Sequence, residues 1–222
     1  MSAIRGSIEE AWRARLDRMR ERALWLETVT PAGQDDQGMA VMEALLGVYA
    51  GLAQWGSAAP AEAERLRARV RRPELAEILR GERAQGALSA YAEDGQRYAL
   101  RGRTDGYRGA CEHRSAVQLL ADDFAEYGVI VDPFVQEAID GFDGELRDVA
   151  ENGTPVHRGQ IPSWAPRSHW WWWAPRTDMS MREYRERLYS GDLEPYESSA
   201  PGAADWLRCG DDKECWCFTA PA

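Results

Sequence analysis

One run of apolar residues constrains the fold of this 222-residue chain more than any other feature. Val135 is followed four, seven, eleven and fourteen positions later by Ile139, Phe142, Leu146 and Val149. Such spacings place the side chains on one face of an α-helix. Pro133 suits the first helical position, and the Asp132 carboxylate can cap free backbone amides there. The chain must therefore bury at least one amphipathic helix against other elements.

Helical patterns also fill the part of the chain before this run. A capping box, Ser7–Glu10, predicts a helix that ends before Pro31, and a nearly all-apolar helix is expected over 37–55 at the centre of the core. Pro60 predicts the start of a third helix, which ends near Arg72, and one or two short helices are expected over residues 73–91.

Glycines interrupt every period between residues 94 and 114, which predicts a loop with a short hairpin there. A second capping box, Ser115–Gln118, then predicts the start of another helix. Residues 129–131 read as a short extended piece.

We therefore predict a mainly α protein. Its helical domain spans residues 1–190, a Trp/Pro-rich extended segment lies across it, and residues 191–222 form a short irregular acidic tail that contains cysteines. The alternative is an α+β fold with a small sheet built from residues 96–101, 129–131 and 155–173.

The net charge of −10 is concentrated in two places. Residues 122–151 hold ten acids against the single Arg147, and residues 191–222 hold seven acids against Arg208 and Lys213. Such surfaces repel a phosphate backbone, which disfavours nucleic acid as a partner. They attract basic proteins and mainly raise the association rate. The plainer interpretation is a solvated helix face that keeps the protein soluble.

The tryptophans are clustered in an unusual way. Trp170, Trp171, Trp172 and Trp173 are consecutive, and Trp-Ala-Pro-Arg occurs at both 164–167 and 173–176. In an extended chain, alternate side chains point to opposite sides, so one pair of rings would pack on the core while the other covered a ligand. The cationic and imidazole groups that could join such a pocket are Arg158, Arg167, Arg176, His157 and His169. The plainer interpretation is a proline-stiffened segment whose rings fill the core.

Cysteine spacing gives a weaker signal. Cys209, Cys215 and Cys217 lie within nine residues, which could form part of a zinc site, although a C-x-C pair is a poor match to zinc-ligand spacing. A disulfide and free thiols remain alternatives. We expect no other cofactor, and four cysteines in a chain of this length fit a reducing compartment.

The sequence favours a binding protein over an enzyme. It contains no nucleophile elbow, zinc-protease motif, phosphate loop or dinucleotide-binding glycine pattern. It also contains neither a signal-peptide pattern nor an apolar run long enough for a membrane helix, so we expect a cytoplasmic protein. The leading hypothesis is an immunity- or antitoxin-like inhibitor that captures a basic protein through Asp140, Asp143 and Glu145. The alternatives are a small-molecule enzyme or sensor with a pocket at residues 157–176, and a zinc-stabilised scaffold.

Overall fold

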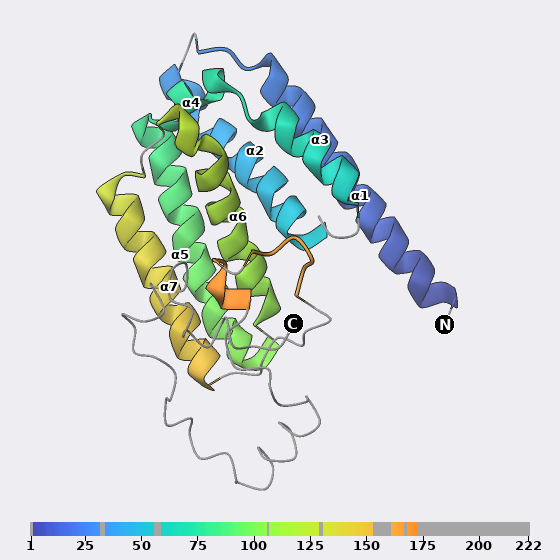
Figure 1. Cartoon of the computed structure of the whole chain (residues 1–222). Coiled ribbons are helices and arrows are strands. Elements are labelled where there is room, and N and C mark those ends of the chain that lie inside the picture. The colour runs from blue at the N-terminus through green and yellow to red at the C-terminus, as the bar shows by residue number, and fades with distance from the viewer. Residues whose placement is uncertain are drawn as a thin grey trace, which may run out of the picture. The chain divides into compact units, whose positions relative to one another are not determined.

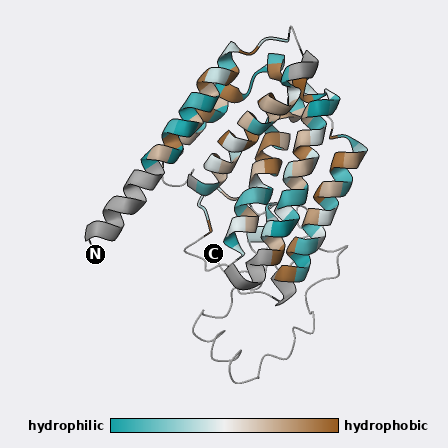
Figure 2. Cartoon of the chain, turned by 180° about the vertical axis from the view of Figure 1, so that it is seen from behind, coloured by the Kyte–Doolittle hydropathy of each residue, from teal (hydrophilic) through white to brown (hydrophobic). Residues whose placement is uncertain are grey.

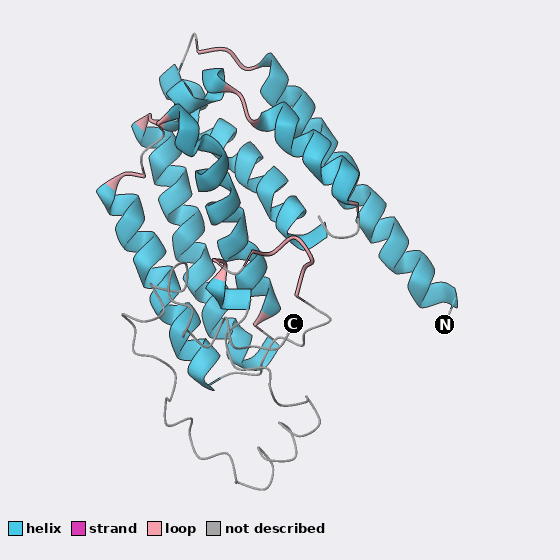
Figure 3. Cartoon of the chain, in the orientation of Figure 1, coloured by secondary structure: helices cyan, strands magenta, loops and turns pink. Residues whose placement is uncertain are grey.

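The structure is a computed structural model, and it describes residues 2–31, 34–55, 59–105, 107–128, 131–152, 161–166 and 168–172. Within these ranges the regular secondary structure is helical, with no strand (Figure 3). The α-helices are α1 (Ser2–Thr28), α2 (Gln34–Trp55), α3 (Pro60–Val70), α4 (Pro73–Leu79), α5 (Glu82–Asp105), α6 (Arg108–Phe124) and α7 (Pro133–Asn152). Two short 3-10 helices, η1 (Ala125–Tyr127) and η3 (Trp170–Trp172), complete the order.

These elements confirm the mainly α prediction. The alternative sheet is wrong at its first strand, because residues 96–101 lie inside α5. Residues 129–130, 153–160 and 173–222, including the acidic tail, lie outside the described residues. The prediction of one domain over residues 1–190 stays a prediction.

The contacts divide the chain into two compact units. The first unit comprises Met1–Glu93 and Glu112–Ile139, and the second comprises Asp94–Cys111 and Asp140–Ala222. Helices α5, α6 and α7 each contribute residues to both units.

In the first unit, α1 packs along α2 and α3, and α2 also contacts α4 (Figure 1). Helix α2 is apolar around most of its circumference, and its buried side chains include Val41, Leu45, Val48, Tyr49 and Leu52. This burial agrees with the position at the centre of a core that the sequence predicts for this helix. Hydrophilic residues dominate the outer side of α1 (Figure 2).

Two glycines allow α1 to approach α2 closely. A Cβ at Gly47 would overlap the guanidinium of Arg22, and a Cβ at Gly51 would overlap the side chain of Met19. The two glycines lie one helical turn apart, so they form consecutive gaps on one face of α2. Each gap receives a side chain from α1.

The predicted loop over 94–114 is wrong. Helix α5 continues to Asp105, and α6 begins at Arg108. Gly95 interrupts the apolar period because it packs against another helix: a Cβ there would overlap the ring of Phe142. A glycine in this position marks a close approach of two helices rather than a turn.

Of the four helix starts predicted from a capping residue or a proline, two are confirmed, and one of these is the start of α3 at Pro60. Phe134 donates its backbone N–H to Asp132 Oδ1 at 2.8 Å, which confirms the cap of α7. The predicted start at Ser115 is wrong, because this residue is buried inside α6. Helix α1 already begins at Ser2, before the capping box at Ser7.

The second unit has a core of its own. Its buried residues come from α5, α6, α7, η3 and the turn residue that precedes α6: Ala99, Tyr107, Ala110, Cys111, Phe142, Leu146, Val149, Trp170, Trp171 and Trp172. Ile161 and Ala165 pack against this cluster. Three of the five apolar residues that predicted α7 therefore belong to the core of the second unit.

Candidate functional site

The outward face of α7 in the second unit carries exposed acids. Because Phe142, Leu146 and Val149 point into the core, the opposite side of the helix faces solvent. Asp140, Gly144 and Asp148 are spaced by four residues on that side, and all three are exposed. The helix thus presents two carboxylates about two turns apart.

Between these carboxylates the helix backbone is open at Gly144 and covered by the Gln96 side chain at Gly141. A Cβ at Gly144 would meet nothing within 4 Å, and the nearest atom to one at Gly141 would be Gln96 Nε2, at 2.6 Å. The missing side chain at Gly144 leaves room for a long basic side chain to lie along the backbone there. We call Asp140, Gly141, Gly144, Glu145 and Asp148 the acidic α7 surface.

The other acids predicted for this site lie differently. Asp143 is only 7% exposed, so a partner on the acidic α7 surface would not reach it. Glu145 is half-buried at the edge of the surface. Asp143 acts inward instead: burial first, and then the charges of Cys111 and Asp143, raise the pKa of Tyr107 well above its ordinary value.

Part of the acidic run belongs to ion pairs within the first unit. Asp123 is buried and pairs with Arg67, and Glu126 pairs with Arg71 at 2.9 Å. The sequence count of ten acids therefore overstates the charge that an approaching partner would meet. The two arginines that neutralise these acids belong to or directly follow α3, more than 50 residues away in the sequence.

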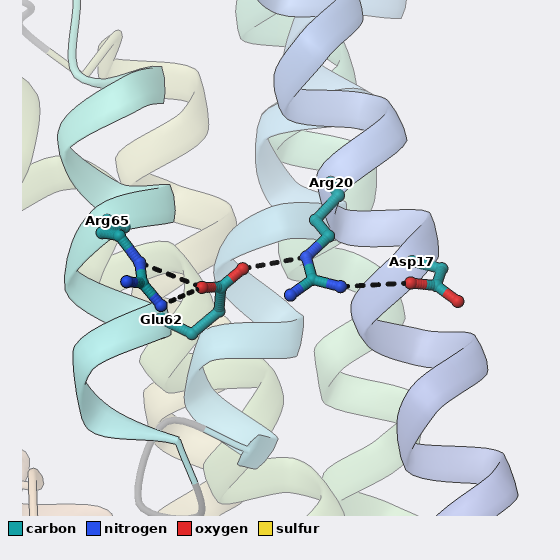
Figure 4. Close-up of polar contacts among 4 residues, drawn as sticks. All are labelled: Asp17, Arg20, Glu62 and Arg65. Carbon is teal, nitrogen blue, oxygen red and sulfur yellow. Dashed lines mark hydrogen bonds and ion pairs between the residues drawn. The ribbon is translucent and has the colours of Figure 1, made fainter.

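The other arginines of α3, and Arg72 just after its C-terminal end, also form ion pairs with carboxylates. The pairs are Arg65 with Glu62, Arg69 with Glu27, and Arg72 with Glu74. Glu62 also accepts a hydrogen bond from Arg20 at 2.8 Å (Figure 4). Hydrogen bonds from Arg20 and Arg65 lower the pKa of Glu62, and one from Arg69 lowers that of Glu27. This network stabilises the packing of α3 and offers no basic surface to a ligand.

The tryptophan run is not extended where the structure describes it. Trp170, Trp171 and Trp172 form one 3-10 turn, and all three rings are buried together with His169. The predicted division into an inward and an outward pair is wrong for these three rings. A turn with about three residues per repeat spreads successive side chains around its axis, and other protein groups cover each one. This burial favours the interpretation that the rings fill the core.

The cluster is held by specific contacts. The thiol of Cys111 donates to the Trp171 carbonyl at 3.2 Å, and the rings of His169 and Trp171 lie 4.7 Å apart. Arg147 places its guanidinium over the ring of Trp170, 5.2 Å from the centroid. A cation over an indole face is an attractive contact. Arg147, the single basic residue within residues 122–151, thus packs against the core of the second unit.

Most other predicted site residues fall outside the described residues. These are His157, Arg158, Arg167, Trp173, Arg176, Cys209, Cys215 and Cys217. In the part of the chain that the structure does describe, no group of three or more His, Cys, Asp or Glu side chains could hold a metal ion. The zinc hypothesis, which rests on the last three cysteines, is therefore untested. Among the described helices, none combines the length and apolar character of a membrane-spanning segment.

Sequence reasoning missed the role of the glycines in α7. Gly141 and Gly144 are expected to weaken the helix by about 1 kcal/mol each relative to alanine. The position of Gly144 between Asp140 and Asp148 was the available signal, because a glycine on an acidic face can expose the backbone there. Comparison of the chain with models of protein families, with characterised proteins and with solved structures found no significant match.

Proposed function

We propose that the chain is a non-enzymatic binding protein that captures a basic protein partner on the acidic α7 surface, in the manner of an immunity protein or antitoxin. The observation that supports this proposal is that two exposed carboxylates, Asp140 and Asp148, lie on either side of the open backbone at Gly144. A lysine or arginine of the partner would lie along the helix with its charged end at one carboxylate.

The rigidity of α7 supports the same proposal. Phe142 and Leu146 anchor the helix in the core, and Gly95 lets α5 pack closely behind it. Surface carboxylates on a rigid helix keep their spacing in the free protein, so less ordering is required when a partner binds. Exposed charges of this kind mainly accelerate association, and their effect decreases as salt is added.

The test is a double charge reversal, Asp140→Arg with Asp148→Arg. Both positions are exposed, so the variant should fold. The matched control is Glu43→Arg with Glu64→Arg, which changes net charge equally at exposed positions of α2 and α3. The wild type and both variants are immobilised, and an arginine-rich peptide and an extract of the host are passed over each.

We expect the α7 variant to bind the peptide at least about tenfold more weakly than the control, because a like charge replaces an attractive one at each site. The same variant should lose a basic protein that the wild type and the control retain from the extract. If the control loses binding to the same extent as the α7 variant, only net charge matters and the proposal is wrong.

A further inference from the structure

Two arginines of α1 occupy positions where the sequence pattern calls for apolar residues. The buried positions of this helix include Met19, Ala23 and Leu26. Arg15 and Arg22 lie four residues before and three residues after Met19, so they share its face of the helix. Both side chains are half-buried on the side of α1 that faces the other helices of the first unit.

Neither arginine is neutralised as those of α3 are. The Nε of Arg15 is buried and has no hydrogen-bond partner, and Arg22 lies against the bare backbone of Gly47. Within the described residues, no ion pair is formed by Arg15, Arg18 or Arg22. A buried donor that lacks an acceptor costs free energy. A group that accepts a hydrogen bond from Arg15 Nε would therefore stabilise the protein.

The charges around Arg15 are unbalanced. Burial lowers the pKa of Arg15, and the like charges of Arg22 and Arg18 lower it further. Tyr91 of α5 and Glu112 of α6 act in the opposite direction. Arg15, Arg18 and Arg22 follow one another at spacings of three and four residues, so the three guanidinium groups lie along one side of α1.

Aromatic rings lie in the same part of the first unit. The rings of Tyr91 and His113 are stacked, with centroids 3.7 Å apart and planes within 8°. The His113 ring also forms a hydrogen bond to the Tyr91 carbonyl at 2.7 Å, so this pair connects α5 and α6 rigidly. Tyr91, whose charge acts on Arg15, is therefore held in a fixed position.

The geometry points to an anion-binding site at Arg15, Arg18 and Arg22 that takes a phosphate group, either free or as a small phosphate monoester. Guanidinium groups bind the oxygens of such groups in pairs. A phosphate monoester carries close to two negative charges at neutral pH and is attracted by several neighbouring guanidinium groups. An oxygen of the ligand would supply the acceptor for the buried Nε of Arg15. This site belongs to the first unit and is independent of the acidic α7 surface.

The test titrates the full-length protein with sodium phosphate and with glycerol phosphate, by calorimetry and by thermal unfolding. Sodium chloride at the same ionic strength serves as the reference. The variants are Arg15→Gln, Arg18→Gln and Arg22→Gln, and the matched control is Arg20→Gln, on the same helix but engaged with Glu62 and Asp17 (Figure 4). Arg18 is exposed, so at least one variant removes a charge from the site without disturbing the packing.

We expect each phosphate compound to raise the unfolding temperature of the wild type and of Arg20→Gln more than chloride does. Removing one guanidinium should weaken binding by about tenfold or more. Tighter binding of glycerol phosphate would identify an organic monoester as the ligand class, whereas tighter binding of inorganic phosphate would identify the free ion.

A second readout separates a binding role from a structural one. Without phosphate at low salt, Arg15→Gln should unfold at the same temperature as the wild type or higher, because the variant loses like-charge repulsion. A structural arginine would show the opposite change. The proposal is overturned if chloride matches phosphate, or if Arg15→Gln, Arg18→Gln and Arg22→Gln bind phosphate as the wild type does.

Discussion

Asp123 and Arg67 form a bidentate pair: the carboxylate accepts hydrogen bonds from Nε and Nη2 of the guanidinium, each at 2.6 Å. Asp123 also accepts one from the hydroxyl of Tyr49 at 2.8 Å. A single buried carboxylate therefore connects α2, α3 and α6 within the first unit.

Replacing Asp123 with alanine should lower the free energy of unfolding by about 2–4 kcal/mol, since it leaves the buried Tyr49 hydroxyl and the partly buried Arg67 without their acceptor. Glu62→Ala is the comparison, because that carboxylate pairs with two largely exposed arginines and should cost at most about 1 kcal/mol. Urea denaturation of both variants measures the difference. Equal losses would mean that the buried pair contributes no more than an exposed one.

The protein should lose stability in alkaline solution. Burial and the neighbouring Asp123 raise the pKa of Tyr49, and burial raises that of Tyr107, in both cases well above the ordinary value. Their contribution is complete below the pKa of an unfolded tyrosine, about 10, and is lost as the pH rises above it. The ultraviolet absorbance of phenolate should therefore show two tyrosines that ionise only when the chain unfolds.

Phenylalanine variants assign these two tyrosines. Tyr49→Phe and Tyr107→Phe should each remove one of the delayed ionisations, whereas Tyr98→Phe, at an exposed position, should remove neither. Complete tyrosine ionisation before the helical circular dichroism signal falls would contradict the burial of both hydroxyls.

Gly95→Ala should destabilise the protein although alanine favours helix formation. The new Cβ would overlap the ring of Phe142, and forcing an extra carbon into a packed contact costs about 1–3 kcal/mol. Gly86→Ala in the same helix meets nothing within 4 Å and should stabilise the protein by about 0.5–1 kcal/mol. Thermal unfolding of the two variants should thus change in opposite directions, and a gain at both positions would refute the close contact.

Cys111 should be protected from thiol reagents in the folded protein. Its side chain is fully buried and donates to the Trp171 carbonyl. In a variant with Cys209, Cys215 and Cys217 replaced by serine, a thiol reagent should label Cys111 only after denaturant is added. Rapid labelling in native buffer would indicate that η3 readily leaves the core of the second unit.

Local patterns predicted the helices more reliably than they predicted the contacts between them. The cap at Asp132 depends on residues that are neighbours in sequence, and it was predictable. The glycines over 94–114 were misread because a glycine has the same local signature whether it ends a helix or admits a ring from another helix. Only the position of Phe142 opposite Gly95 distinguishes the two cases.

The candidate sites were predictable to different degrees for the same reason. The acids of α7 stand out in the sequence, and helical spacing alone places Asp140 and Asp148 on one side. The ion pair between Asp123 and Arg67 joins residues 56 positions apart, and no local sequence pattern indicates it. The short 3-10 turn of Trp170–Trp172 likewise follows from packing in the core of the second unit, since four consecutive tryptophans have no periodicity.

The side chains of Arg22 and Met19 fill the gaps at Gly47 and Gly51, and together they fix the register of α1 against α2. A shift of α1 along α2 would remove both side chains from their gaps at once and would press other side chains against the bare backbone. The alignment of the two helices is therefore encoded in their own surfaces and does not depend on the connection between Thr28 and Gln34. An insertion in that connection, or a cut there that makes new chain ends, should leave the pairing of the helices intact.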